Sequence, residues 1–351
     1  MDEDVKIPDT LTGLVVDRFS PLYDEARMDY NTGLPPFFPK YIVFCFDVHD
    51  VQNAVRWSQA HGLPIRARSG RHSYEGYSLV DGGVVIDVSR LNQVELTHGS
   101  GKAVIGAGAD LQPIYQKLWD DGRLTIPGGS CPTVGIAGLT LGGGFGSISR
   151  LFGLTCDVLE SLEMVDVNGD VIRASESENE NLFWASCGGG GGNFGIVTSF
   201  TFKTFPIDKV TVFTLTWRWP DLRAVMKAFQ VWADPQFLDR RVVPILKLTS
   251  EQAGQVAVVG EFVGPLEDMF FLLQPLIQAA QCAPAVRGPT AVYFFAGLKP
   301  PHAENGQLAL LLLPHPFSGQ AHEKFKNTSA YQFNLFPDAT IDTMYGRITG
   351  R

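Results

Sequence analysis

The sequence lacks the patterns that mark several large classes of protein. Its five cysteines are odd in number and widely spread, with no C-x-x-C pair, which argues against a disulfide framework and against a zinc site. No apolar run approaches the roughly 18 residues that a membrane span needs. Residues 1–4 are acidic where a targeting segment is basic, so we expect a cytoplasmic protein.

Positive charge and the commonest catalytic motifs are also scarce. Acidic residues outnumber basic ones by 37 to 28, which gives no general support for a nucleic-acid partner or an anionic membrane. The patterns G-x-x-x-x-G-K-[ST], G-x-S-x-G and H-E-x-x-H do not occur, which argues against a nucleotide hydrolase, a serine hydrolase or a zinc protease. The 351 residues, 45% of them hydrophobic, instead predict a folded chain of two domains or one large one.

Hydrophobic periodicity predicts mixed strands and helices in the first part of the chain. Strands are expected at 41–46, 84–88, 103–108 and 196–202, with a polar turn between the second and third, and helices at 47–62 and 110–122. Asp47 is a suitable N-cap for the first helix. Two apolar runs within 158–174 flank Asn168-Gly169, which predicts a β-hairpin with a type I′ turn.

The pattern changes near Pro206, where we place a domain boundary. Residues 210–219 alternate, with Phe213, Leu215, Trp217 and Trp219 on one face, and residues 221–233 follow as an amphipathic helix. Strands at 242–248 and 256–263 and a helix from about residue 265 complete an α+β arrangement. The dense apolar runs 270–273 and 308–313 are expected to be core.

Glycine is concentrated in three clusters, at 66–73, 128–146 and 188–195. Such loops let backbone N–H groups approach phosphate oxygens, which favours a phosphate-bearing cofactor over chance turns. Residues 190–195 satisfy G-x-G-x-x-G, but the strand predicted after them stands where a dinucleotide fingerprint needs a helix. This context argues against a nicotinamide-binding Rossmann domain.

Three ordered motifs in these clusters resemble the flavin-linked oxidases of the berberine bridge enzyme type. The motifs are Ser69-Gly70-Arg71-His72-Ser73-Tyr74-Glu75-Gly76, then Cys131-Pro132-Thr133-Val134-Gly135 with Gly142 to Gly146, and Leu182-Phe183-Trp184-Ala185 with Asn193 to Thr198. The resemblance covers nearly the whole chain. It implies an α+β fold with a two-subdomain, PCMH-type FAD-binding domain at 1–206 and an antiparallel, helix-covered substrate domain at 207–351.

The resemblance also implies a bicovalently bound FAD. The family's histidine, here His72, bonds to the flavin 8α methyl, and its cysteine, here Cys131, bonds to ring carbon 6. Imidazole nitrogen and thiolate are suitable nucleophiles for these two bonds to the flavin. The alternative is that His72 is an ordinary surface histidine and Cys131 a small buried cysteine, neither with a role in attachment. The other cofactor contacts implied are Arg68, Ser69, Gly70, Arg71, Ser73, Tyr74, Gly76, Ser78, Gly129, Val134, Gly135, Gly138, Leu139, Gly142, Gly143, Phe145, Gly146, Gly192, Asn193, Gly195, Ile196 and Val197.

Within that set, Val134 stands where the family controls oxygen access, and a valine there resembles the oxidases, although it could serve packing alone. Arg71 replaces the usual second glycine of the first motif, either as a contact to phosphate or as a solvent-facing residue. Leu139 stands where many plant members have a histidine, which weakens any transfer of alkaloid or cannabinoid chemistry. No metal site is expected, and the remaining histidines lack metal spacing.

The implied reaction is hydride transfer from an alcohol, a sugar or a secondary metabolite to FAD, with O₂ as acceptor and H₂O₂ as product. The family's catalytic base would lie beyond Arg351, so the substrate domain is expected to be incomplete, with Tyr293, Tyr331 or a partner chain as substitutes. A homodimer would cover the sheet edge that missing strands expose. The alternatives are a dehydrogenase with another acceptor, and a catalytically impaired flavin-binding protein.

Overall fold

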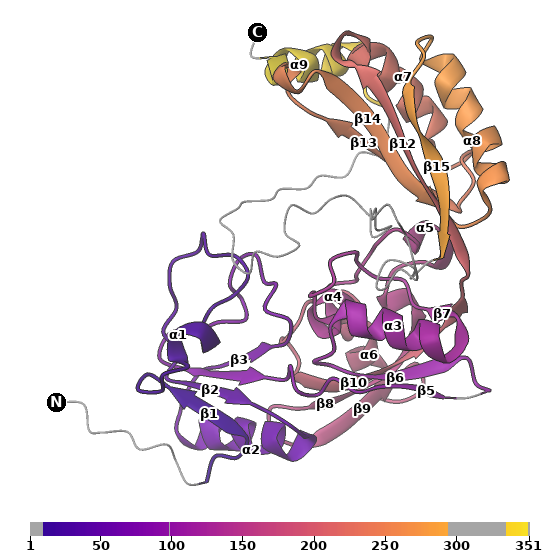
Figure 1. The fold of residues 1–351 in the computed structure, drawn as a ribbon. Coiled ribbons are helices and arrows are strands. Elements are labelled where there is room, and N and C mark those ends of the chain that lie inside the picture. Colours follow the sequence, from indigo (N-terminus) through magenta and orange to yellow (C-terminus); the bar gives the residue numbers. More distant parts are fainter. Residues whose placement is uncertain (1–9, 98, 294–334, 350–351) are drawn as a thin grey trace. The chain divides into compact units, whose positions relative to one another are not determined.

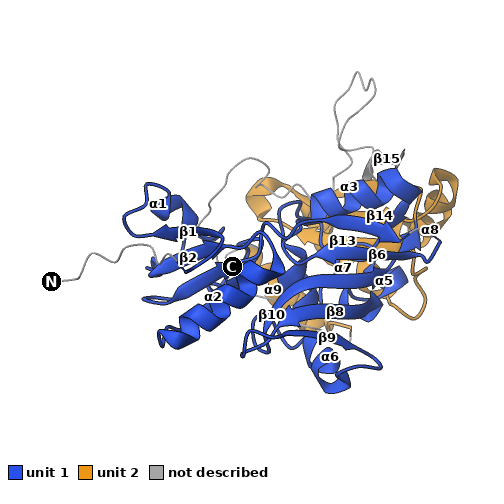
Figure 2. Ribbon diagram, turned by 90° about the horizontal axis from the view of Figure 1, so that it is seen from below, with its two compact units in different colours: residues 1–206, 316–327 blue, residues 207–315, 328–351 orange. Residues whose placement is uncertain are grey.

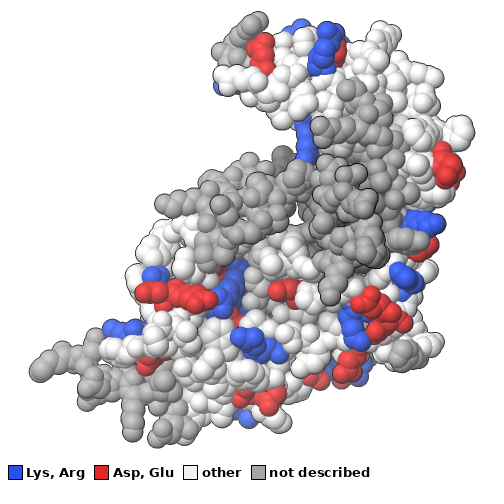
Figure 3. Space-filling view, in the orientation of Figure 1, with Lys and Arg blue, Asp and Glu red and all other residues white. Residues whose placement is uncertain are grey.

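The computed structural model describes residues 10–97, 99–293 and 335–349, and Figure 1 shows its fold. The chain divides between Pro206 and Ile207 into two compact units, which are coloured separately in Figure 2. Of the helices in the described ranges, none is both long and apolar enough to cross a bilayer. On the face of unit 1 seen in Figure 3, basic and acidic side chains lie interspersed.

Unit 1 begins with a four-stranded sheet. Its order is β1 (Leu14–Asp17), β2 (Tyr41–Phe44), β4 (Val84–Asp87) and β3 (Ile65–Arg68). The last three strands are parallel, and β2 and β4 are buried along their whole length, as their uninterrupted apolar sequences require. Two helices belong to this part, α1 (Tyr23–Ala26) and α2 (Val48–Ala60). Asp47 caps α2 as predicted, because its carboxylate accepts from the Asp50 N–H.

The second sheet of unit 1 is antiparallel and five-stranded. Its order is β5 (Val94–Thr97), β6 (Lys102–Gly106), β10 (Ile196–Lys203), β8 (Leu159–Val165) and β9 (Val171–Ser175). A short pair, β7 (Leu124–Thr125) with β11 (Phe205–Pro206), and the helices α3 (Leu111–Gly122), α4 (Ile136–Leu141), α5 (Ser149–Phe152) and α6 (Glu180–Ser186) complete the unit, with a 3₁₀ turn at Cys156–Val158. Residues of both sheets, such as Val43, Ile86 and Phe200, share one hydrophobic core. The predicted strands and helices of this unit are confirmed, but β5 lies where only a polar turn was expected.

The hairpin between β8 and β9 is confirmed, but its predicted type I′ turn is wrong. That turn needs a positive φ at both central residues, whereas Gly169 has φ 78° and Asn168 is not in the left-handed region. Instead, the Asp166 carboxylate accepts hydrogen bonds from the N–H groups of Asn168 and Asp170, both at 2.8 Å. The loop is therefore longer and is organised by an aspartate side chain.

Unit 2 is an antiparallel sheet covered by helices. The strand order is β13 (Val242–Leu248), β14 (Gln255–Phe262), β12 (Lys209–Arg218) and β15 (Ala285–Tyr293), and the helices are α7 (Leu222–Trp232), α8 (Leu266–Ala279) and α9 (Asp338–Thr349), with 3₁₀ turns at Trp219–Asp221 and Glu251–Ala253. Phe213, Leu215 and Trp217 are buried on one face of β12, as the alternation predicts. The predicted α+β class is confirmed.

One packing expectation in unit 2 needs correction. Within the apolar run 270–273, Leu273 is buried, but Phe271 is 77% exposed because it lies on the outer side of α8. Helical periodicity separates these two residues, so a continuous apolar run need not be continuous core. The run 308–313 lies outside the described residues.

Candidate cofactor site

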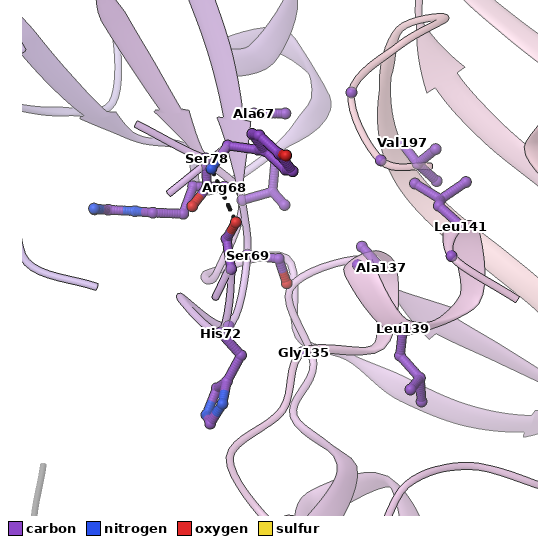
Figure 4. A pocket seen from close by; sticks show the side chains of 18 of the residues that line it. Ala67, Arg68, Ser69, His72, Ser78, Gly135, Ala137, Leu139, Leu141 and Val197 are labelled. Carbon is purple, nitrogen blue, oxygen red and sulfur yellow. Dashed lines mark hydrogen bonds between the residues drawn. The ribbon is translucent and has the colours of Figure 1, made fainter. Parts of the chain in front are cut away.

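A cavity of about 470 Å³ lies in unit 1, where the three glycine-rich segments come together. This volume is within the range of roughly 300–1,000 Å³ that small-molecule sites have. Figure 4 shows Ser69 and His72 after β3, with Gly135, Ala137 and Leu139 opposite them. The lining residues are Ala67, Arg68, Ser69, Gly70, Arg71, His72, Ser73, Tyr74, Tyr77, Ser78, Val88, Val134, Gly135, Ala137, Gly138, Leu139, Leu141, Gly142, Gly190, Gly191, Gly192, Gly195, Ile196 and Val197.

The first two glycine-rich loops cross in direct backbone contact. A Cβ atom on Gly70 would lie 2.2 Å from the Gly135 nitrogen, and one on Gly135 would lie 2.5 Å from the Gly70 nitrogen. Neither position has room for a side chain unless the backbone moves. The second loop is held in turn by residues 109–111, because Leu111 N–H donates to Val134 O at 3.0 Å and Ile136 N–H to Ala109 O at 2.9 Å.

The third glycine-rich loop closes the cavity from the side of α4. Gly190 N–H donates to Leu141 O at 2.7 Å, which ties this loop to the end of the helix. A Cβ on Gly192 would lie 3.6 Å from the Ala67 side chain, so the loop also reaches the end of β3. Segments more than a hundred residues apart in sequence thus form one wall.

The two residues predicted to bond the flavin share a neighbour, Thr133. His72 Nε2 lies 2.9 Å from Thr133 Oγ1, and Cys131 Sγ lies 3.8 Å from the same oxygen. His72 is further fixed by Tyr30, whose ring stacks on the imidazole with centroids 4.3 Å apart. Tyr30 N–H also donates to Arg71 O at 2.9 Å, which holds the histidine loop.

The charged groups at the cavity include a buried ion pair. Arg68 Nε donates to Asp87 Oδ2 at 2.7 Å, and both side chains are 0% exposed. The terminal nitrogens Nη1 and Nη2 of Arg68 have no hydrogen-bond partner among the described residues, although Arg68 lines the cavity. Arg71 Nε lies 4.0 Å from the same carboxylate, and burial lowers the pKa of Arg71, helped by the neighbouring Arg68 charge.

Two further carboxyl groups near the cavity have perturbed acidity. Burial, with a smaller contribution from the Asp87 charge, raises the pKa of Asp110 to about 6. Burial also raises the pKa of Asp29, although the hydroxyl of Ser78 donates to its Oδ2 at 2.7 Å. In the described part of the chain, no group of three or more His, Cys, Asp or Glu side chains could hold a metal ion.

Most of the residues implied by the motifs line this cavity, but several do not. Ser69 lines the cavity, but its hydroxyl donates a hydrogen bond to Ala107 O at 2.8 Å, so this proton holds the loop in place. Seven implied residues lie in the adjoining loops outside the lining: Gly76, Gly129, Cys131, Gly143, Phe145, Gly146 and Asn193. Seven lining residues were not anticipated: Ala67, Tyr77, Val88, Ala137, Leu141, Gly190 and Gly191. Ala137 and Leu141 share a face of α4, since they are four residues apart, and this spacing could have been used to find them.

The comparisons with known proteins agree with the motifs. A family model described as FAD binding domain matches residues 39–175. The FAD-linked oxidoreductase YvdP of Bacillus subtilis is 38% identical over 336 residues, which are 95% of this chain and 72% of YvdP. The chain belongs to the berberine bridge enzyme-like FAD-linked oxidoreductases. The FAD-linked oxidoreductase YgaK of the same species is 44% identical over 273 residues, and the match covers 77% of this chain but 60% of YgaK.

Solved structures of this oxidoreductase family have the same fold. A variant of BBE-like 1 from Physcomitrella patens superposes with a TM-score of 0.85 at 30% identity, covering 97% of this chain and 73% of that one. Glucooligosaccharide oxidase from Acremonium strictum gives a TM-score of 0.81 at 26% identity, covering 96% of this chain and 69% of that one.

The residues of the cavity fit FAD. A buried arginine with two incompletely bonded nitrogens and a loop of backbone N–H groups suit a pyrophosphate. Because the lining glycines have no side chains, the backbone itself forms part of the cavity wall. Apolar surface for ring systems comes from Leu139, Leu141, Ile196 and Val197. Of the proposed substitute bases, Tyr331 and the Tyr293 side chain lie outside the described residues.

Proposed function

We propose that this chain is the FAD-carrying part of an oxidoreductase that takes a hydride from a C–H bond bearing a hydroxyl or an amine. Dioxygen takes both electrons in the end, so an alcohol and O₂ give a carbonyl compound and H₂O₂. The observation that carries this proposal is the cavity, in which three glycine-rich loops, a buried arginine and His72 converge.

The chain's own residues would bind and orient the cofactor, which supplies the two-electron acceptor when bound. Arg68 Nη1 and Nη2, with the backbone N–H groups of 69–73, would neutralise and hold the pyrophosphate. Gly138 and Gly142 would lie along the ribityl chain, and Ile196 and Val197 would contact the adenosine end. Asp87 would keep the Arg68 side chain oriented, because its carboxylate engages Nε alone.

Covalent attachment through His72 and Cys131 is part of the proposal. Glucooligosaccharide oxidase from Acremonium strictum has a 6-S-cysteinyl, 8α-N1-histidyl FAD. In this chain, His72 and Cys131 lie on the two loops that cross at Gly70 and Gly135, and both contact Thr133. His72 lines the cavity and Cys131 lies on the adjoining loop, so the two nucleophiles are close enough together for double attachment.

A carbohydrate is the first substrate class to test. Chitooligosaccharide oxidase of Gibberella zeae is 33% identical over 259 residues, which are 73% of this chain and 51% of that one. We therefore expect oxygen uptake with oligosaccharides in the presence of the whole protein. A secondary-metabolite alcohol would be the next class.

The intact mass of the denatured protein, measured with its visible absorption, tests the cofactor. We expect one added FAD and a yellow colour that survives denaturation. For alanine variants of His72 and Cys131, the matched controls are His49→Ala and Cys282→Ala. His49 is an exposed residue of α2 and Cys282 belongs to unit 2, so both controls should keep the flavin. A colourless wild-type protein at its bare mass after supply of FAD would contradict the proposal.

Reoxidation by oxygen separates an oxidase from a dehydrogenase. Val134 lines the cavity on the Cys131 loop. Val134→Ile should slow the reaction of reduced protein with O₂ and leave the rate of flavin reduction by substrate nearly unchanged, because the added methyl group obstructs oxygen alone. Stopped-flow absorption measures both rates in one sample. A wild-type protein that reacts slowly with O₂ but rapidly with a dye acceptor would instead be a dehydrogenase.

A further inference from the structure

Thr133 has one hydroxyl group within reach of both predicted nucleophiles. The distances from its Oγ1 are 2.9 Å to His72 Nε2 and 3.8 Å to Cys131 Sγ. A hydroxyl carries one proton and two acceptor lone pairs, so it can accept from one neighbour and donate to the other. A single side chain is therefore able to set the protonation of both residues.

The direction of these two contacts follows from the chemistry of attachment. If His72 Nε2–H donates to Thr133 Oγ1, the imidazole is the tautomer whose lone pair is on Nδ1. The Thr133 proton is then available to Cys131 Sγ, where an O–H···S contact stabilises the thiolate, the reactive form of cysteine. Both nucleophiles are prepared by one hydrogen-bonded chain that runs from nitrogen through oxygen to sulfur.

We propose that Thr133 is a positioning residue for covalent flavin attachment, one that directs His72 to react through Nδ1 and promotes the thiolate of Cys131. This inference rests on the proposed function. Thr133 does not touch the reacting carbon atoms in this scheme; it acts through the two residues that do.

Each attachment has a complete balance. His72 Nδ1 bonds to the 8α carbon, one C–H proton of that methyl group is released, and two electrons enter the flavin. The alkylated imidazole then loses its Nε2 proton. Cys131 Sγ bonds to carbon 6 with loss of the S–H and C–H protons and transfer of two electrons. In both cases O₂ removes the two electrons and two protons as H₂O₂.

Hydrogen bonds hold the backbone on both sides of Thr133. Val134 N–H donates to Cys131 O at 3.3 Å, which closes a tight turn around Thr133, and Gln112 N–H donates to Pro132 O at 3.0 Å. On the other side, Tyr30 stacks on the His72 ring. The contact between Gly70 and Gly135 then fixes the distance between the two loops.

The test compares Thr133→Val, which keeps the shape and removes the hydroxyl, with Thr133→Ser, which keeps the hydroxyl. Thr97→Val, on an exposed position of β5, is the matched control. Each FAD-free protein is mixed with FAD in air. The attached fraction is followed over time by acid precipitation and by the masses of the proteolytic peptides that contain residues 72 and 131. Total bound flavin before denaturation and far-UV circular dichroism are recorded in parallel.

We expect Thr133→Val to bind FAD but to attach it at least about tenfold more slowly at both peptides, because the hydroxyl no longer selects the His72 tautomer or supports the thiolate. Thr133→Ser and Thr97→Val should attach it at the wild-type rate. Wild-type attachment rates in Thr133→Val would overturn the inference and leave the proposed function intact. So would failure of Thr133→Ser to restore the rate, or equal loss of total bound flavin. A wild-type protein that binds FAD without any covalent bond would overturn both this inference and the attachment on which it rests.

Discussion

The buried pair of Arg68 and Asp87 offers a prediction whose size follows from the structure. Asp87→Asn removes the charge but keeps an oxygen to accept the Ser89 N–H, which Asp87 Oδ1 now accepts at 2.9 Å. The backbone contact is thus preserved, while the guanidinium of Arg68, 0% exposed, loses its counter-ion. Breaking one side of a buried pair costs about 3–5 kcal/mol. We expect the free energy of unfolding, measured with urea and far-UV circular dichroism, to fall by that amount.

The double variant Arg68→Met/Asp87→Asn removes both charges and separates folding from binding. Replacing a buried ion pair by uncharged groups of similar volume is often close to neutral, so the double variant should regain most of the stability lost in Asp87→Asn. It should nevertheless bind FAD more weakly. Each lost hydrogen bond from a charged donor is worth about 1.5–3 kcal/mol, which corresponds to a loss of affinity of roughly tenfold or more.

The affinity is best measured by fluorescence titration with FAD in a background of His72→Ala and Cys131→Ala, in which no covalent bond forms. Unchanged FAD affinity in the double variant would falsify the assignment of Arg68 to the pyrophosphate. An Asp87→Asn protein as stable as the wild type would show that the Arg68 charge is compensated by another group, and the reasoning on the buried pair would fail.

Two further predictions concern acidity and backbone contact. Because the native Asp110 carboxyl, with its pKa raised to about 6, binds a proton more tightly than the unfolded one, the free energy of unfolding should fall as pH rises from about 4 to 6. Asp110→Asn should remove this fall and gain about 1–2 kcal/mol at neutral pH, after allowance for partial solvent exposure; urea unfolding across this pH range measures both. Gly70→Ala should lose most FAD binding, since its Cβ would lie 2.2 Å from Gly135 nitrogen. Gly99→Ala strains a turn with φ 78° but has nothing within 4 Å and lies outside the cavity lining, so it should bind FAD normally. Equal binding by the two alanine variants, measured by titration, would contradict the steric argument.

Local sequence predicts a strand correctly wherever the burial of its side chains matches its hydrophobic periodicity. The strands β2 and β4 are uninterrupted apolar runs that both faces of a parallel sheet require. Strand β12 alternates because one face packs on helices. Strand β5 has only four residues, alternately half-buried and exposed, so its sequence does not differ from that of a polar connection. Its pairing with β6 is a tertiary contact that no local pattern contains.

The sequence predicts the three glycine-rich loops of the site but not how these loops contact one another. Glycine in a motif indicates that a backbone needs freedom or close approach, yet it does not name the partner, and the contact of Gly70 with Gly135 joins two such positions. Tyr30 carries no motif and lies in a stretch of irregular sequence far from His72. Its stacking on the His72 ring is a tertiary contact that depends on the folded first sheet. Thr133 belongs to the second motif, Cys131 to Gly135, but its place between His72 and Cys131 depends on that same crossing of loops.

Arg71 illustrates how the scaffold and the site share one set of charges. It has φ 61°, a left-handed conformation that suits the glycine usual at this motif position and costs a residue with a side chain about 1 kcal/mol or more. Its side chain is 32% exposed and lies over Phe44, with Nε 4.0 Å from Asp87. The same carboxylate thus faces two guanidinium groups at the edge of the cavity, and the charges of Asp29 and Glu25 also act on Arg71. Both guanidinium groups would attract a bound pyrophosphate, so Arg71 adds to the affinity of the site for an anion even where its own nitrogens do not reach it.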